Sequence, residues 1–98
     1  CAKCEYSGVL SGTKSSAYLP SAAGFQSSTG AIKVSLSGPA NADFDLYVYK
    51  LSGTVWRKVA SSLSSSSTEL INYKGTPGKY RIKVLSYFGG GKYIARIL

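Results

Sequence analysis

The chain has 98 residues, a length that supports one domain, and its 44% hydrophobic content argues against disorder. Twelve lysines and arginines against four aspartates and glutamates give a formal net charge of +8, which predicts attraction to anionic partners. No apolar run approaches the ~20 residues of a membrane-spanning helix. No signal peptide opens the chain, so we expect a mature product or an excised domain.

The first 30 residues give few structural signals. Residues 5–10 are expected to form a first strand, and a shorter strand is expected near residues 17–19. Cys1 and Cys4 form a C-x-x-C pair that lacks the second pair, or the histidines, needed to complete four zinc ligands. No helix follows it, as a thioredoxin-like redox pair would require. A local disulfide is the alternative, and it would need a turn to bring the two residues close enough.

Strict alternation of apolar and polar residues predicts three strands over residues 31–37, 44–50 and 79–87. Alternation with a period of two indicates a strand with one buried face. The residues expected to pack together in the core are Ile32, Leu46, Val48, Ile82 and Val84.

Turn residues separate these strands. Ser52-Gly53-Thr54 predicts a hairpin into residues 55–60, and Gly89-Gly90-Gly91 predicts another into residues 92–98. Residues 74–78 separate a strand at 69–73 from the strand at 79–87, and Ser61–Ser67 is expected to be a surface loop. No segment shows the 3.6-residue period of a helix. The sequence therefore predicts an all-β fold, an antiparallel β-sandwich or jelly roll of seven to eight short strands, in a single domain over residues 1–98.

Catalytic residues are hard to find in this chain. It contains no histidine, which excludes Ser-His-Asp and Cys-His arrangements. Serine and lysine are too abundant for any one Ser-Lys pair to stand out. Asp43 and Asp45 point to the same side of one strand, at a spacing compatible with acid–base chemistry, but such sites normally need a deep cleft. We expect no enzymatic activity.

Asp43 and Asp45 are also the candidate metal ligands. Calcium prefers six to eight oxygen ligands, which two carboxylates and nearby loop carbonyls could begin to provide. The alternative is that an Asp at the start of a strand caps the preceding turn. Only four carboxylates exist, and Glu5 and Glu69 are distant from Asp43 in sequence. We therefore expect no obligatory cofactor and at most a small effect of calcium on stability.

Aromatic residues outside the expected core form the candidate binding site. If the core faces are as predicted, Tyr47, Tyr49 and Tyr87 point outward, and Trp56 lies in the next strand. Such rings bind sugar faces and proline-rich or collagen-like chains, because they offer a large contact area at low entropic cost. The alternative is that these tyrosines are simply half-exposed residues of an antiparallel sheet. The cations expected to border the rings are Lys79, Arg81 and Lys83.

A nucleic-acid partner is not expected. Lysine and tyrosine interleaved on strands can stack single-stranded bases. However, the positive residues are spread along the chain without a basic run. A composition rich in serine, glycine and tyrosine is instead typical of exported bacterial β-modules.

The order of several motifs resembles the bacterial pre-peptidase C-terminal domain family. The matching segments are Asp43-Phe44-Asp45-Leu46-Tyr47-Val48, Trp56, Val59-Ala60-Ser61, Glu69-Leu70-Ile71-Asn72-Tyr73 with Gly75, Gly78-Lys79-Tyr80-Arg81-Ile82-Lys83-Val84, Ser86-Tyr87, Gly89-Gly90-Gly91 and Tyr93. The resemblance covers residues 31–98, whereas residues 1–30 match only in general pattern. By position, Asp43 and Asp45 match the family's acidic strand, and Tyr87 matches the tyrosine of its S-Y pair.

The resemblance implies a compact β-sandwich appended to secreted proteases and other hydrolases. Family members are usually noncatalytic, some are removed during maturation, and related collagen-binding domains hold their enzyme on an insoluble substrate with calcium. This chain departs from the family in being strongly basic and in lacking the acid cluster of its calcium-binding relatives.

The leading hypothesis is therefore a secreted, monomeric, extracellular accessory domain of a bacterial hydrolase, expected to be a protease. It would bind or present an insoluble polymer, beside a parent catalytic domain. The first alternative is a carbohydrate-binding module of a chitinase- or glycanase-like enzyme. The second is a structural or maturation domain without a ligand. No membrane partner is expected.

Overall fold

The computed structural model describes residues 4–64 and 66–97, and these residues form nine β-strands. In chain order the strands are β1 (Cys4–Leu10), β2 (Ser16–Leu19), β3 (Phe25–Ser27), β4 (Ala31–Ser37), β5 (Asp43–Ser52), β6 (Val55–Ser62), β7 (Glu69–Lys74), β8 (Gly78–Phe88) and β9 (Gly91–Ile97). The predicted all-β class is confirmed. The sequence predicted seven to eight strands. The additional strand is β3, which has three residues and pairs with β8.

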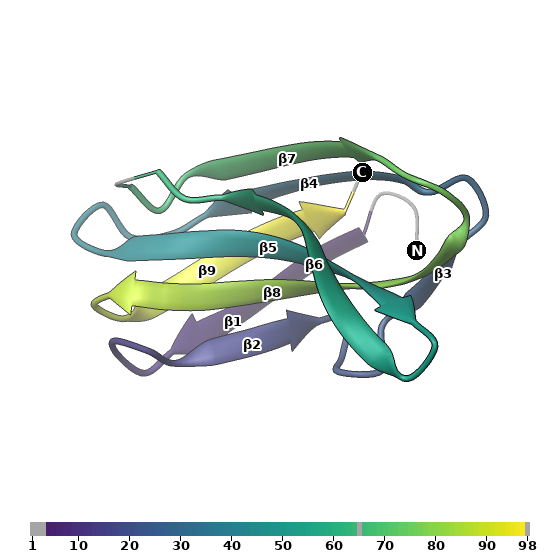
Figure 1. Ribbon diagram of the computed structural model, residues 1–98. Helices are drawn as coiled ribbons and strands as arrows, with labels where there is room; N and C mark the ends of the chain where they lie inside the picture. The colour runs from purple at the N-terminus through teal and green to yellow at the C-terminus, as the bar shows by residue number, and fades with distance from the viewer. Residues whose placement is uncertain (1–3, 65, 98) are drawn as a thin grey trace.

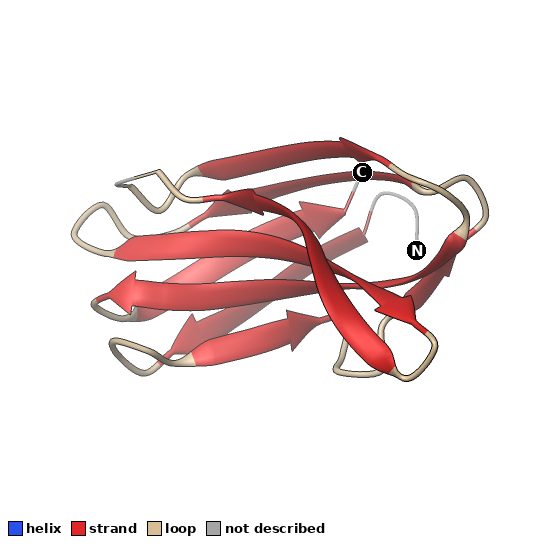
Figure 2. Ribbon diagram, viewed as in Figure 1, coloured by secondary structure: helices blue, strands red, loops and turns tan. Residues whose placement is uncertain are grey.

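The strands form two antiparallel sheets packed face to face (Figures 1 and 2). One sheet has the order β1-β9-β4-β7, and the other has the order β2-β8-β5-β6, with β3 also paired to β8. Within the described part of the chain no helix is long and apolar enough to cross a membrane.

The core lies between the two sheets and follows from the alternation of the strands. Phe44, Tyr80 and Val84 are completely buried, as are their apolar neighbours two positions along the same strands. The core residues predicted from the sequence are all buried, namely Ile32, Leu46, Val48, Ile82 and Val84. Because every second residue of β5 and β8 is fixed in this core, the residues between them must lie on the outer face of the sheet.

The two glycine turns behave differently. Ser52-Gly53-Thr54 closes the predicted hairpin, since Ser52 pairs with Val55. The hairpin predicted at Gly89-Gly90-Gly91 is wrong, because β8 and β9 belong to different sheets. The turn carries the chain across the sandwich, with Gly89 and Gly91 at positive φ values of 80° and 141°. Glycine adopts these values without the steric cost of a side chain, and a turn signal does not encode which sheet the next strand joins.

The serine-rich segment is only partly a surface loop. β6 extends to Ser62, so the expected loop begins later than predicted. Ser67 is 3% exposed; its hydroxyl donates to the Ala42 carbonyl at 2.7 Å and accepts from the Phe44 amide at 3.3 Å. This serine therefore anchors the start of β5. The predicted link between Cys1 and Cys4 involves Cys1, which lies outside the described residues.

Candidate functional site

The outer face of the β2-β8-β5-β6 sheet gathers aromatic and cationic side chains from four strands. In the registers of this sheet, Lys83 of β8 is opposite both Tyr18 of β2 and Tyr47 of β5. Tyr49 pairs with Arg81, and Trp56 of β6 pairs with Leu51. We call the following residues the ring-and-cation face: Tyr18, Tyr47, Tyr49, Trp56, Lys58, Arg81 and Lys83.

Arg81 is at the centre of this face. Its guanidinium carbon lies 4.1 Å from the ring centroid of Tyr18 and 4.4 Å from that of Trp56, with Tyr49 further away at 6.0 Å. Its Nη1 donates to the carbonyl oxygen of Ala22 at 2.8 Å. A planar guanidinium stacks on ring faces while donating in its own plane. Arg81 therefore holds two rings from different strands in fixed positions.

The contact between Trp56 and Arg81 depends on the shape of β6. The pairing of β5 with β6 shifts register between Val48 and Tyr49. Such irregularities bend a strand and increase its twist, and β6 sweeps across the face in Figure 1. The Trp56 ring then packs over Gly24, where an added Cβ would lie 2.9 Å from it.

A second group of contacts orders the other end of the face. The rings of Tyr47 and Tyr49 are 6.3 Å apart, and the Lys58 ammonium lies 5.3 Å from the Tyr47 centroid. Lys83 lies 5.8 Å from the ring of Tyr18. Burial, followed by the negative charge of Asp45, raises the pKa of Tyr47. The Tyr47 hydroxyl is therefore a neutral hydrogen-bond donor across the physiological range.

Five of the seven predicted binding residues meet on this face: Tyr47, Tyr49, Trp56, Arg81 and Lys83. Lys79 is exposed near the start of β8, opposite Gln26 of β3. Tyr87 is near the other end of β8. Its neighbours Ser86 and Phe88 pair with consecutive residues of β5, so Tyr87 is the extra residue of a β-bulge. These two residues lie toward opposite ends of the face.

Sequence reasoning missed Tyr18 and Lys58. A signal for Tyr18 existed, because a strand near residues 17–19 must alternate like any other strand. Leu19 faces the core with 6% exposure, so its neighbour Tyr18 faces outward. The sequence does not reveal which strand lies beside Tyr18, and its partner Arg81 is distant along the chain.

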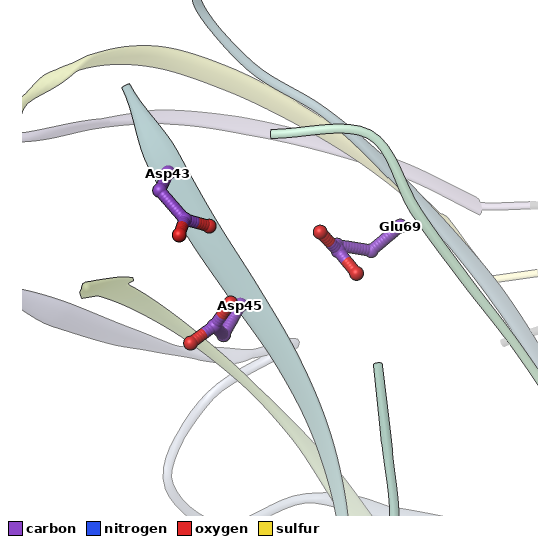
Figure 3. Close-up of side chains that lie close together, drawn as sticks. All are labelled: Asp43, Asp45 and Glu69. Carbon is purple, nitrogen blue, oxygen red and sulfur yellow. The ribbon is translucent and has the colours of Figure 1, made fainter. Parts of the chain in front are cut away.

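The second feature is a group of three carboxylates, which we call the acidic cluster. Asp43 and Asp45 project from the same side of β5, and Glu69, at the start of β7, points toward them (Figure 3). One oxygen from each carboxylate lies within 4.8 Å of the others. Glu69 is distant from Asp43 in sequence but close to it in space, because packing of the two sheets brings the starts of β5 and β7 together.

Burial differs within the acidic cluster, and so does hydrogen bonding. Asp45 is 6% exposed and Glu69 3%. Glu69 accepts bonds from the Ser62 hydroxyl, from the Ser64 amide at 3.1 Å and from the Ser64 hydroxyl at 2.6 Å. By contrast, one buried oxygen each of Asp43 and Asp45 has no hydrogen-bond partner. Burial, then the charges of Asp43 and Glu69, raises the pKa of Asp45 to about 6.

The turn-capping interpretation of Asp43 is not supported. The backbone groups of this turn are bonded to Ser67, which contacts the Ala42 carbonyl and the Phe44 amide. Asp43 and Asp45 instead line a hollow of about 240 Å³, together with Tyr47, Leu63 and Tyr87. The donor set of the cluster is entirely carboxylate oxygen, which suits a hard cation such as calcium.

The fold defines an antiparallel β-sandwich module. Residues 26–86 match the model of the bacterial pre-peptidase C-terminal domain, which is more than half of the chain. The chain belongs to the bacterial pre-peptidase C-terminal domain family. Domains of this family are noncatalytic accessory domains and occur in secreted bacterial proteases. The stated resemblance to this family is thus confirmed. The matched region begins within β3, earlier than the expected residue 31, and ends at residue 86, before the last motifs quoted for the resemblance.

Solved structures of similar fold agree with this assignment. The pre-peptidase C-terminal domain of collagenase from Bacillus anthracis superposes with a TM-score of 0.74 at 18% identity, over 99% of this chain and 90% of that one. The Yersinia pseudotuberculosis-derived mitogen gives 0.67 at 18% identity, over 96% and 82%. PirA gives 0.70 at 8% identity, over 96% and 93%. Such different proteins share the fold, so function must be argued from the sites.

Proposed function

We propose that this chain is a noncatalytic accessory domain of a secreted bacterial hydrolase, a protease, and that it binds an insoluble polymeric substrate through the ring-and-cation face. The observation that carries the proposal is the fixed position of Arg81 between Tyr18 and Trp56. Rings held on strands by such contacts lose little entropy when a ligand covers them.

The composition of the face suits a chain-like ligand. Its four aromatic residues come from three strands, so a polymer can contact several of them in succession. Each well-packed ring anchor adds about 1–3 kcal/mol to binding. Lys58 and Lys83 add attraction to carboxylate, carbonyl or sulfate groups, and this part is screened by salt.

A protein polymer such as collagen is the favoured ligand. Tyrosine and tryptophan rings pack well on proline-rich chains, whose extended conformation is already ordered. The structural relative of highest TM-score among those described above is the domain of a collagenase. A polysaccharide is the competing ligand, because the same rings can stack on sugar faces.

Two observations support the absence of catalysis. The chain contains no histidine. Asp43 and Asp45 lie beside each other on one strand, rather than on opposite sides of a cleft where a glycosidic bond could fit between them (Figure 3). The parent catalytic domain would supply the chemistry, and this domain would hold it on the substrate as a monomeric, extracellular module.

The test is retention of the purified domain on insoluble collagen, chitin, chitosan and cellulose. We expect retention on collagen that decreases only partly in high salt, because ring contacts are not screened. Retention on a polysaccharide alone would identify a carbohydrate-binding module. Retention on none of the four would support a structural or maturation domain.

A further inference from the structure

We propose that Asp43, Asp45 and Glu69 form a binding site for one divalent cation of calcium's size, which connects the two sheets of the sandwich. The proposal does not depend on polymer binding. It rests on the convergence of the three carboxylates, on their uncompensated charge and on the hollow beside them.

The spacing of the oxygens fits one calcium ion. Calcium–oxygen distances are about 2.3–2.6 Å, so a single ion spans opposite ligands about 4.6–5.2 Å apart. One oxygen each of Asp43, Asp45 and Glu69 lies within 4.8 Å of the others. Magnesium, at about 2.0–2.1 Å, spans only about 4.2 Å and retains its waters more strongly. The 4.8 Å limit allows all three oxygens to contact one calcium ion, and calcium is favoured because magnesium gives up its waters reluctantly and is seldom held by protein ligands alone.

Among residues 4–64 and 66–97, no cationic side chain forms an ion pair with the acidic cluster. Asp45 is only 6% exposed, and its Oδ1 lacks a hydrogen-bond partner. The buried Oδ1 of Asp43 also lacks one. Among the described residues, the ion pair found joins Arg96 of β9 to Glu5 of β1, neither of which belongs to the cluster. The protein contains twelve cationic residues. None of those described forms an ion pair with Asp45 or Glu69, the most buried carboxylates. Buried charges are normally paired or bound to a metal.

The surroundings supply the remaining features of a cation site. Ser62 and Ser64 donate to both oxygens of Glu69, which fixes the orientation of its carboxylate. From the described residues, Glu69 Oε2 accepts one hydrogen bond, which leaves a lone pair for an ion. The hollow of about 240 Å³ beside Asp43 and Asp45 provides an entry path and room for several water ligands.

The location gives the ion a structural role. Asp43 and Asp45 belong to the β2-β8-β5-β6 sheet, whereas Glu69 belongs to the β1-β9-β4-β7 sheet. A bound ion would join the sheets at one end of the sandwich. It would also order the wall of the hollow formed by Tyr47 and Tyr87.

The experiment compares the full chain with Asp45→Asn, with Glu5→Gln as the matched control. Glu5 is an exposed acid of β1 that does not belong to the acidic cluster. Each protein is stripped with a chelator, then titrated with calcium while the melting temperature is followed. Terbium is titrated in parallel, since tyrosine rings near the site sensitise its luminescence. Magnesium serves as the comparison ion.

We expect millimolar calcium to raise the melting temperature of the parent and of Glu5→Gln by at least about 5 °C. Asp45→Asn should show no rise, at least tenfold weaker terbium luminescence, and a higher melting temperature than the parent in chelator, because a buried charge has been removed. Magnesium should bind at least tenfold more weakly than calcium. If Asp45→Asn does not fold, Asp43→Asn replaces it. A parent that responds to neither calcium nor terbium, or a variant that responds like the parent, would overturn the site.

Discussion

Arg81 is stacked against Tyr18, with its guanidinium carbon 4.1 Å from the ring centroid, although β2 and β8 are far apart in sequence. Trp56 contacts the same guanidinium at 4.4 Å. One cation therefore fixes two rings that come from strands at the two edges of the β2-β8-β5-β6 sheet.

Replacing Arg81 by alanine should loosen both rings. We expect the free energy of unfolding to fall by about 1–2 kcal/mol, the range of partly buried cation–π contacts. Trp56 is the only tryptophan, so its fluorescence reports directly on the change. Arg81→Lys should not restore the emission, because an ammonium lacks the planar surface of a guanidinium. Lys33→Ala, at an exposed position of β4, is the control. Unchanged stability and emission in Arg81→Ala would show that the stack contributes nothing.

Gly24 is a second position on which the face depends. It has φ of +80°, and an added Cβ would lie 2.4 Å from the Tyr80 carbonyl oxygen and 2.9 Å from the Trp56 ring. Backbone cannot move away as easily as a side chain end, so Gly24→Ala should destabilise the domain by more than about 1 kcal/mol and displace Trp56.

The matched control is Gly12→Ala, where nothing lies within 4 Å of the added Cβ. Urea denaturation, monitored by tryptophan fluorescence, gives the free energy of unfolding, and the emission of the folded state reports the displacement of Trp56. Equal stability of the two variants would mean that the loop around Gly24 adapts freely.

The pKa of Asp45 predicts a pH dependence of stability. This pKa is raised from 3.8 to about 6, so the folded domain holds the proton more tightly than the unfolded chain. The contribution of Asp45 to folding stability is therefore fully present at pH values below the pKa of the unfolded chain. It is lost as the pH rises through the pKa of the folded domain. For the chelated domain, the contribution of Asp45 should fall by about 2–3 kcal/mol between about pH 4 and pH 7.

Other ionisable groups contribute to the overall pH profile, so the informative quantity is the difference between the parent and Asp45→Asn. Urea denaturation across the pH range, with chelator present, should show the parent losing stability relative to the variant as pH rises. Parallel pH profiles would indicate that Asp45 has an ordinary pKa.

Much of the fold was predictable because alternation is a local property. Phe44, Leu46 and Val48 define the buried face of β5 without reference to any other strand. Tyr47 and Tyr49 then lie on the outer face by necessity. The connection through Gly89 and Gly91 was not predictable, since a turn that crosses between sheets uses the same residues as a hairpin turn.

The unpredicted parts of the sites depend on contacts distant in sequence. Glu69 reaches Asp43 and Asp45 only because β7 packs opposite β5, and the charge count alone gave no reason to group them. Tyr18 reaches Arg81 only through the pairing of β2 with β8. Sequence reasoning identified the residue types that the sites use, but not which strands would bring them together.

The most direct test of the proposed function is the retention of Tyr47→Ala/Tyr49→Ala on insoluble collagen, compared with the parent. The two rings lie 6.3 Å apart on the outer face of β5, away from the core, so their removal should leave the circular dichroism spectrum and cooperative unfolding intact. Leu70→Ala, at an exposed residue of β7 on the opposite sheet, is the control and should bind like the parent. The account predicts that the double variant stays folded and loses at least tenfold in affinity for the polymer that retains the parent. A folded double variant with the parent's affinity would contradict the assignment of binding to the ring-and-cation face.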